Sequence, residues 1–223
     1  LPILWFRYYP INVLSGDFFL THQRENSIFL CLGDVSGHGP LAALFASQIS
    51  GMFKILAENE DGAKEIVMAI NQHLYHAKNN LSNLPKKQTL YALLNVLKVS
   101  ETKLEFCIAG NSVPPLYYSA QKNMLNVLNT PSTPTGLFNN KNFRVYSDVI
   151  DFEKGDMFIM FTDGVTEAEM LDGSLVEYSR AHQQIQEQIS NKVVPGEFLD
   201  RFLTWLTHNA EIQDDLSIVF ISK

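Results

Sequence analysis

Four aspartates are placed where they could act together in chemistry, because each stands where an apolar segment begins or ends, beside glycine or a second acid. They occur in four short segments: Ser15-Gly16-Asp17, Gly33-Asp34-Val35-Ser36-Gly37-His38-Gly39, Thr162-Asp163-Gly164 and Gln213-Asp214-Asp215. Carboxylates that converge at a sheet edge repel one another unless a divalent cation neutralises them, and ligand sets made only of oxygen suit Mg²⁺ or Mn²⁺. The pattern therefore predicts a metal site, although spacing along the chain does not establish that the four aspartates meet.

Each of these residues also has a purely structural interpretation. An aspartate beside glycine commonly caps a helix or stabilises a turn, and His38, between two glycines, is expected to order the turn rather than bind metal. Glu167 and Glu169, which follow the third segment, are expected to be helix-start or solvated acids. Arg7 could meet a phosphate, but a single arginine more often forms a surface ion pair.

The periodicity of apolar residues indicates the elements that must position the aspartates. Apolar, β-branched or aromatic runs predict strands at Leu1 to Tyr9, Ser27 to Leu32, Thr89 to Val99, Lys103 to Ala109, Leu116 to Ser119, Phe143 to Ile150, Met157 to Phe161 and Leu216 to Ile221. Three- and four-residue spacing predicts helices at about Pro40 to Glu58, from after Asp61 to Lys78, Tyr178 to Ser190 and Pro195 to Asn209. This order indicates the α+β class, and two antiparallel sheets with a helix layer outside each would satisfy it.

The composition excludes several classes of protein. Of the 223 residues, 46% are hydrophobic and 18% are charged, which is typical of a soluble globular protein. The 24 acidic residues outnumber the 17 basic ones, for a net charge of −7, and the absence of a basic stripe argues against nucleic-acid binding. No apolar run approaches the roughly 20 residues of a membrane span, so no membrane is expected. Cys31 and Cys107 lie within predicted strands as structural thiols, which weakly favours the cytoplasm.

Nothing in the sequence marks a boundary inside the chain. It has no internal repeat, no low-complexity tract and no linker rich in Pro, Gly or Ser, so we expect residues 1–223 to form a single domain. The chain begins without Met in an expected strand, and we therefore expect it to be the C-terminal part of a longer signalling protein. A homodimer through the N-terminal aromatic strand or the first helix pair stays open.

Four segments together carry a resemblance to a known family. GDVSGHGPLAAL, AGNSVPPLYY, FTDGVTEA and QDDLSIVF follow one another in that order. They resemble the metal-dependent PPM-type (type 2C-like) serine/threonine protein phosphatases, in their bacterial SpoIIE-like branch, and the match runs from about Tyr8 to the C-terminus. The resemblance implies a sandwich of two antiparallel β-sheets flanked by helix pairs (α-β-β-α), with two Mn²⁺ or Mg²⁺ ions at the sheet edge.

The same resemblance implies roles for individual residues. Asp34 would bridge both ions, and the carbonyl of Val35 would bind one of them. Asp163 and Asp214 would complete the shell of the first ion, while Asp17 would serve the second. Asp34, Asp163 and Asp214 are also the expected catalytic residues. The implied reaction is hydrolysis of a phosphoserine or phosphothreonine by a metal-activated water, which needs no phosphoenzyme and no nucleophilic side chain.

The sequence departs from the family pattern at three places. Leu20 stands where the first family motif commonly has a second acid, and Asn111 stands where the family usually has His before the Pro pair. After FTDGVTEA the family normally continues to a Phe-Gly pair, whereas this chain has Leu175-Val176-Glu177-Tyr178, so the segment Glu169 to Arg180 is expected to pack differently. The aspartates expected to bind the metal ions are all retained, which favours activity.

We therefore expect a cytoplasmic metal-dependent phosphatase whose substrate is a phosphorylated signalling protein, such as an anti-sigma-factor antagonist. The resemblance also implies an upstream regulatory domain in the same chain, and the helix pair from Pro40 to Lys78 would be its natural target because it follows Asp34 directly. One alternative is a catalytically weak or silent binding module of the same fold that regulates a partner protein, which Leu20 and Asn111 motivate. Another is a hydrolase of small phosphates, although the chain lacks a Walker-type glycine loop for nucleotides.

Overall fold

The computed structural model describes residues 2–11, 15–37, 39–80, 90–110 and 113–223. These residues belong to two units, each built on one antiparallel sheet. The first unit contains Leu14–Ser112 and Asn129–Phe152, and the second contains Pro2–Val13, Val113–Leu128 and Glu153–Lys223. Each unit has its own helix pair and its own apolar core.

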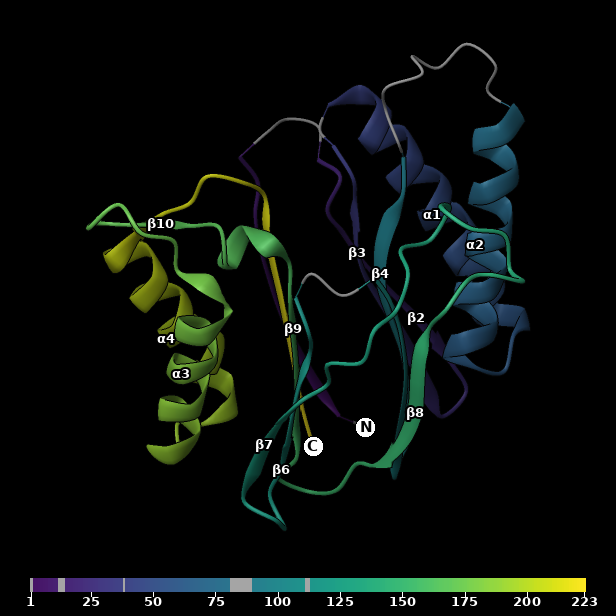
Figure 1. The fold of residues 1–223 in the computed structure, drawn as a ribbon. Coiled ribbons are helices and arrows are strands. Elements are labelled where there is room, and N and C mark those ends of the chain that lie inside the picture. The colour runs from purple at the N-terminus through teal and green to yellow at the C-terminus, as the bar shows by residue number, and fades with distance from the viewer. Residues whose placement is uncertain (1, 12–14, 38, 81–89, 111–112) are drawn as a thin grey trace. The chain divides into compact units, whose positions relative to one another are not determined.

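The sheet of the first unit has the strand order β2-β3-β4-β5-β8, and every neighbouring pair is antiparallel. Its strands are β2 (Phe18–Arg24), β3 (Ser27–Val35), β4 (Ala92–Val99), β5 (Lys103–Ala109) and β8 (Tyr146–Asp151). Helices α1 (Pro40–Asn59) and α2 (Ala63–Asn80) cover one face of this sheet (Figure 1). Phe29, Cys31 and Val35 alternate along β3 and join the core beneath the helices, as the two-residue repeat of a strand requires.

Helix α1 begins directly after the turn that follows β3. Pro40 lies in its first turn, where the missing backbone N–H costs no helical hydrogen bond. Phe45, Ile49 and Phe53 are at most 3% exposed and belong to the core of the first unit. Among the helices of the described residues, α1 is the one that is long and apolar enough to cross a membrane by length and composition.

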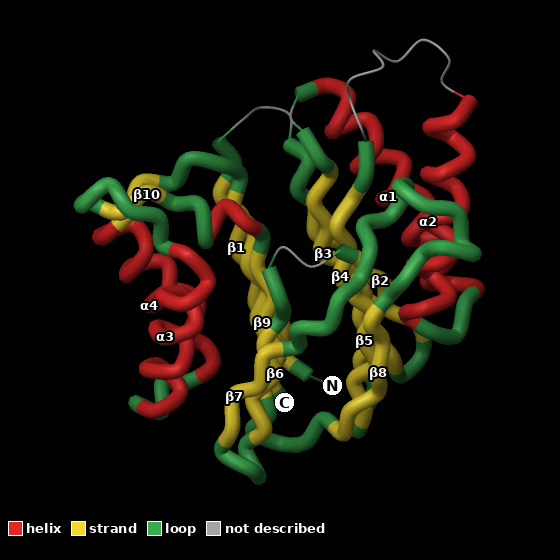
Figure 2. Tube along the Cα trace, in the orientation of Figure 1, coloured by secondary structure: helices red, strands yellow, loops and turns green. Residues whose placement is uncertain are grey.

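The sheet of the second unit has the order β1-β12-β9-β6-β7, again with antiparallel neighbours. Its strands are β1 (Ile3–Tyr9), β6 (Leu116–Ser119), β7 (Met124–Val127), β9 (Met157–Phe161) and β12 (Leu216–Ser222). Helices α3 (Glu177–Ser190) and α4 (Pro195–Asn209) lie side by side against it (Figure 2), and the rings of Phe198 and Phe220 stack 4.6 Å apart between α4 and β12. The short pair β10 (Glu169–Met170) and β11 (Ala210–Glu211) completes the unit, together with the 3₁₀ turn η1 (Asp163–Val165).

The predicted α+β class, with two antiparallel sheets and four helices, is confirmed. The stacking of the sheets in a sandwich and the single domain stay predictions. Strands β2, β7, β10 and β11 are not predicted from the sequence. The predicted end of β3 is also too early, because the strand continues past Leu32 to Val35 and so contains Asp34. The predicted strand from Thr89 is β4, which begins later, at Ala92, because Leu90 and Tyr91 lie outside the strand.

The two cysteines are buried within strands, as expected. Cys31 in β3 and Cys107 in β5 are both 0% exposed, and neither forms a disulfide. Burial raises the pKa of Cys107 to about 12. It also raises the pKa of Cys31 far above the ordinary thiol range. A thiol that stays protonated is a poor nucleophile, so both residues are structural.

Candidate active site

Two of the predicted acids meet in the second unit because their strands are neighbours. Asp163 begins η1 one residue after the end of β9, and Asp214 lies just before β12. Strands β9 and β12 are antiparallel, so the end of one and the start of the other share one edge of the sheet. The backbone N–H of Thr162 donates to the Ser217 carbonyl at 2.9 Å, and the N–H of Ser217 donates to Thr162 Oγ1 at 2.9 Å.

Gly164 lets the turn η1 lie close to the start of β12. A Cβ atom at position 164 would lie 2.2 Å from the carbonyl oxygen of Asp215 and 3.1 Å from that of Asp214. The first distance is shorter than real Cβ contacts, so a larger residue would push the turn away from the start of β12. The glycine of the Thr162-Asp163-Gly164 segment therefore holds Asp163 beside Asp214.

Asp215 and its neighbour Asp214 differ in burial and in their hydrogen bonds. Asp215 is 7% exposed, and its Oδ1 accepts a hydrogen bond from the backbone N–H of Ile11 at 2.6 Å. Asp214 is exposed, and its Oδ1 accepts from the N–H of Asp215 at 2.7 Å. Asp215 thus ties the segment after β1 to the start of β12, while Asp214 remains at the surface.

The charges of Asp163 and Asp214 act on each other and on a third acid, Glu167. Burial, and then the negative charge of Asp214, raise the pKa of Asp163 above its ordinary range. Burial, and then the charges of Asp163 and Asp214, also raise the pKa of Glu167. The N–H of Glu167 donates to the Asp163 carbonyl at 2.8 Å, which brings residue 167 back over the turn. Glu167 is nevertheless exposed, as expected of a solvated acid, and it lies within the field of Asp163 and Asp214.

The donor chemistry of this acid group fits a hard divalent cation. All three side chains offer carboxylate oxygens, and their mutual repulsion is what a cation would relieve. Within the ranges that the structure describes, no group of three or more His, Cys, Asp or Glu side chains is arranged so that it could hold a metal ion. The three carboxylates therefore fit a divalent cation by their charge and by the type of their donor atoms.

The first unit places the other three predicted ligands at one end of its sheet. Asp34 and Val35 are the last residues of β3, and Asp17 directly precedes β2, which is antiparallel to β3. The N–H of Val35 donates to the Gly16 carbonyl at 3.2 Å. A Cβ atom on Gly16 would lie 2.6 Å from the Val35 carbonyl oxygen, so only glycine lets this segment approach so closely.

The turn between β3 and α1 has the backbone geometry that its glycines predict. Gly37 and Gly39 have φ values of 86° and 80°, in the left-handed region that favours glycine. The N–H of Ser36 donates to the Tyr91 carbonyl at 2.9 Å, and the N–H of Tyr91 donates to Ser36 Oγ at 3.0 Å. His38 lies outside the described residues.

Two of the departures from the family pattern have structural explanations. Leu20 lies on β2 opposite Cys31 and packs against the apolar core of the first unit, an environment that suits leucine better than an acid. Glu177 has a φ of 55°, so it holds the left-handed conformation that the glycine of a Phe-Gly pair would provide. Its N–H donates to the Thr166 carbonyl at 2.9 Å, close to Glu167 in the sequence. Asn111 lies outside the described residues.

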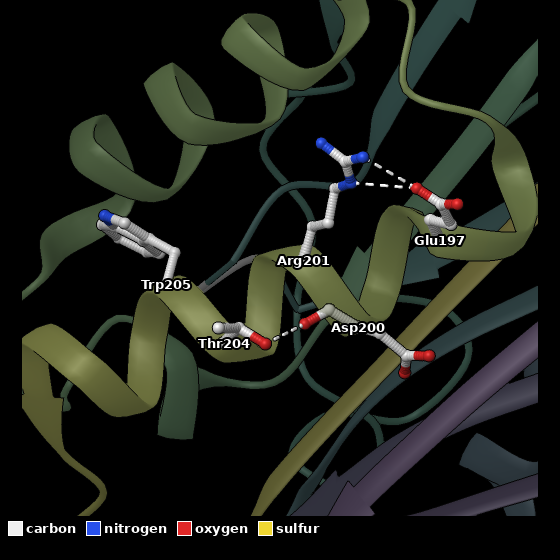
Figure 3. Close-up of a pocket in the computed structure, with 5 residues that line it drawn as sticks. All are labelled: Glu197, Asp200, Arg201, Thr204 and Trp205. Carbon is white, nitrogen blue, oxygen red and sulfur yellow. Dashed lines mark hydrogen bonds and ion pairs between the residues drawn. The ribbon is translucent and has the colours of Figure 1, made fainter.

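Arg7 and the helix α4 lie apart from this chemistry. Arg7 forms a 2.7 Å ion pair with Asp200, as expected of a surface arginine. Near it, α4 carries a shallow hollow of about 520 Å³ that Figure 3 shows, lined by Glu197, Asp200, Arg201, Thr204 and Trp205. Arg201 pairs there with Glu197 at 2.8 Å, and no predicted ligand lines the hollow.

Comparison with known proteins gives the family of the chain. The family described as Stage II sporulation protein E (SpoIIE) matches residues 24–223. Phosphoserine phosphatase RsbU of Bacillus subtilis (strain 168) is 28% identical over 166 residues, which are 74% of this chain and 47% of RsbU. The chain therefore spans about half the length of this curated relative.

Solved structures show the same fold. The SiaA-PP2C domain of Pseudomonas aeruginosa matches with a TM-score of 0.78 and 16% identity, over 99% of this chain and 85% of that one. The PP2C phosphatase domain of SpoIIE from Bacillus subtilis, solved with a fragment of its regulatory domain, matches with a TM-score of 0.75 and 16% identity, over 100% and 63% of the two chains. RsbX in complex with magnesium matches with a TM-score of 0.71 and 16% identity, over 99% and 94%. The chain therefore belongs to the SpoIIE family of PP2C-type serine phosphatases.

Proposed function

We propose that this chain is an active, metal-dependent phosphatase that hydrolyses phosphoserine or phosphothreonine on a signalling protein. The observation that carries the proposal is the acid pair of the second unit, where the neighbouring strands β9 and β12 bring Asp163 beside Asp214 and the negative charge of Asp214 helps to raise the pKa of Asp163. Carboxylates kept close together at a cost in charge repulsion are typical of a functional site rather than of a structural turn. Gly164 supports the same conclusion, because a larger residue there would push the turn that carries Asp163 away from the start of β12.

The proposed ligands are those that the sequence predicts. Asp17, Asp34 and the Val35 carbonyl would hold two Mn²⁺ or Mg²⁺ ions together with Asp163 and Asp214. When bound, the cations would lower the pKa of a water molecule and neutralise charge on the phosphoryl oxygens. The ligand set contains only oxygen donors, which suits these hard ions, and the structural relative RsbX was solved with magnesium.

The protein's own contribution is to fix the ligands before the substrate arrives. Asp34 is held within β3 by its pairing with Leu93 of β4, so its backbone is as ordered as the sheet. Asp163 is held by the turn η1, whose Thr166 hydroxyl donates to the Asp163 carbonyl at 3.0 Å. Rigid placement of charged groups lowers the reorganisation needed during phosphoryl transfer.

The substrate that fits best is a phosphorylated protein. RsbU, the curated relative, is a phosphoserine phosphatase, and the family resemblance suggests an anti-sigma-factor antagonist as substrate. A cytoplasmic location, an upstream regulatory domain and a homodimer belong to the same proposal. The alternative of a weak or silent binding module rests on Leu20 and Asn111. The apolar surroundings of Leu20 weaken that alternative, since they explain the residue without a loss of function.

Hydrolysis of a phosphoserine protein, with and without Mn²⁺, tests the proposal. The intact chain is compared with Asp34→Asn and Asp163→Asn, and Asp148→Asn serves as the matched control because Asp148 is exposed on β8. We expect activity that requires Mn²⁺, a loss of at least about a hundredfold in the first two variants and no change in the third. An intact chain that binds Mn²⁺ but releases no phosphate would instead favour the binding module.

A further inference from the structure

Asn71 is a polar residue in the middle of the buried face of α2. Its side chain is 0% exposed, and the neighbouring buried side chains of that helix are apolar: Ile66, Val67, Ile70 and Leu74. A buried amide is unfavourable unless its polar atoms are hydrogen-bonded. The partners of Asn71 therefore indicate why an asparagine stands at this place.

All the hydrogen-bond partners given for the Asn71 side chain lie in one stretch of chain before β8, Thr133–Asn140, which we call the connector. Asn71 Nδ2 donates to the Phe138 carbonyl at 3.0 Å and to Asn140 Oδ1 at 2.6 Å, while the N–H of Gly136 donates to Asn71 Oδ1 at 2.9 Å. Both N–H donors of the amide are thus used. The connector runs beside α2 in Figure 1.

Gly136 lets the connector approach the helix closely. Its φ is 83°, and a Cβ atom at this position would lie 3.2 Å from Cβ of Leu74. Both the backbone conformation and the short separation favour glycine here. The contact therefore needs particular residues on both elements: asparagine at position 71 of α2 and glycine at position 136 of the connector.

The connector also pairs with β4. Thr135 is 0% exposed, its N–H donates to the Ala92 carbonyl at 2.8 Å, and the N–H of Ala92 donates to the Thr135 carbonyl at 3.1 Å. On its other side Ala92 pairs with Val35 of β3. Next to it, Tyr91 exchanges hydrogen bonds with Ser36. The first residues of β4 are thus held between the connector and the end of β3.

We propose that Asn71 is a positioning residue for the end of β3. Through Gly136 and Thr135 it fixes the start of β4, and through the hydrogen bonds between Tyr91 and Ser36 it fixes the residue that follows Val35, whose carbonyl the proposed function assigns to a cation. The role toward the cation rests on the proposed function, whereas the hydrogen-bonded relay from Asn71 to Ser36 does not. Asn71 is thus coupled to the site without touching it.

Hydrogen exchange of the Ser36 and Tyr91 backbone amides in the metal-free chain tests the relay. Asn71→Leu removes the polar atoms and keeps an apolar side chain of similar size. Phe53→Leu is the control for lost stability, since Phe53 is buried in the core on α1, and His73→Ala controls for an exposed change on α2. We expect exchange about tenfold faster in Asn71→Leu than in a Phe53→Leu variant of equal global stability. Equal rates in the two variants would overturn the relay.

Calorimetric titration with Mn²⁺ tests the role toward the site. Asn71→Leu is expected to bind Mn²⁺ about tenfold more weakly than Phe53→Leu, as is typical when a residue that orients a ligand is lost. Faster exchange with unchanged Mn²⁺ affinity would overturn the positioning role. If the intact chain binds no Mn²⁺, the proposed function fails, and the exchange rates alone decide whether Asn71 holds the end of β3.

Discussion

Gly164 and Asp215 approach each other so closely that a Cβ atom on Gly164 would lie 2.2 Å from the Asp215 carbonyl oxygen. The turn that carries Asp163 is therefore packed backbone to backbone against the start of β12. Side chains can rotate away from a clash, but two backbones cannot separate without moving the residues they carry. The spacing between Asp163 and Asp214 depends on this contact together with the hydrogen bonds between Thr162 and Ser217.

Gly164→Ala should consequently damage the site and the fold together. We expect the free energy of unfolding to fall by about 1–3 kcal/mol, since the added methyl group forces a backbone shift. We also expect a loss of Mn²⁺ affinity, measured by calorimetry. Gly51→Ala is the matched control, because Gly51 lies within α1 with no atom within 4 Å of an added Cβ. That variant should gain about 0.5–1 kcal/mol and keep its Mn²⁺ affinity. A Gly164→Ala variant with unchanged stability and unchanged Mn²⁺ affinity would show that the turn can move without affecting the site.

Asp163→Asn should stabilise the metal-free protein at neutral pH. An acid whose pKa is raised by folding binds more protons in the folded state than in the unfolded chain. Its contribution to stability is therefore lost as pH rises from the ordinary value of 3.8 through the raised value. Removing the charge should raise the urea midpoint of the metal-free chain at pH 7 and have less effect near pH 3.

The same variant should lose its response to metal. Urea unfolding with added Mn²⁺ should show stabilisation of the intact chain and of Asp148→Asn, but little of Asp163→Asn, because only a cation that binds the folded state shifts the equilibrium. A lower urea midpoint for the metal-free Asp163→Asn variant would mean that the Asp163 charge is satisfied within the protein.

Glu167→Gln should weaken Mn²⁺ binding by about tenfold, less than the loss in Asp163→Asn, because Glu167 reaches the acid group only from the next turn of the chain. The comparison is with Glu169→Gln, a change two residues away on a side chain that is also exposed. Calorimetry on both variants distinguishes the two acids. Equal Mn²⁺ affinities in the Glu167→Gln and Glu169→Gln variants would show that Glu167 is only the solvated acid that the sequence suggested.

Glu177→Gly should make the protein more stable. A residue other than glycine at a φ of 55° is strained, and glycine relieves that strain at some cost in the entropy of the unfolded chain. We expect a net gain of about 0.5–1 kcal/mol in thermal or urea unfolding. Gln186→Gly, on the exposed side within α3, should lose about 1 kcal/mol. A loss in both variants would show that the Glu177 side chain has a stabilising contact.

The sequence predicts the helices well because their apolar residues repeat over many turns, as in α1 and α4. It predicts β2 poorly because the outer half of that strand, Thr21 to Arg24, is polar and its partner strand is needed to recognise it. Asp34 was expected at the end of a strand and lies inside one, since the strand continues through a glycine that usually weakens strands.

The residues that act at a distance were harder to find than the aspartates. Glu167 joins the acid group because a 3₁₀ turn brings residue 167 back toward Asp163, and nothing in its neighbours marks that turn as closed. Asn71 interrupts an apolar helix face, but its partners Gly136 and Phe138 lie far along the chain. Motifs identify ligands by type, whereas positioning residues are identified by contacts that only the fold creates.

Asp214 and Asp215 have different roles, and this difference limits which sequence changes the segment before β12 can tolerate. Asp215 is committed to the Ile11 backbone N–H, and successive residues entering a strand point to opposite sides. Deleting or inserting one residue before Leu216 would exchange the positions of the two acids, so that the anchoring carboxylate would face solvent and the exposed one would be buried. The segment should therefore tolerate substitutions at its other positions far better than any change in its length.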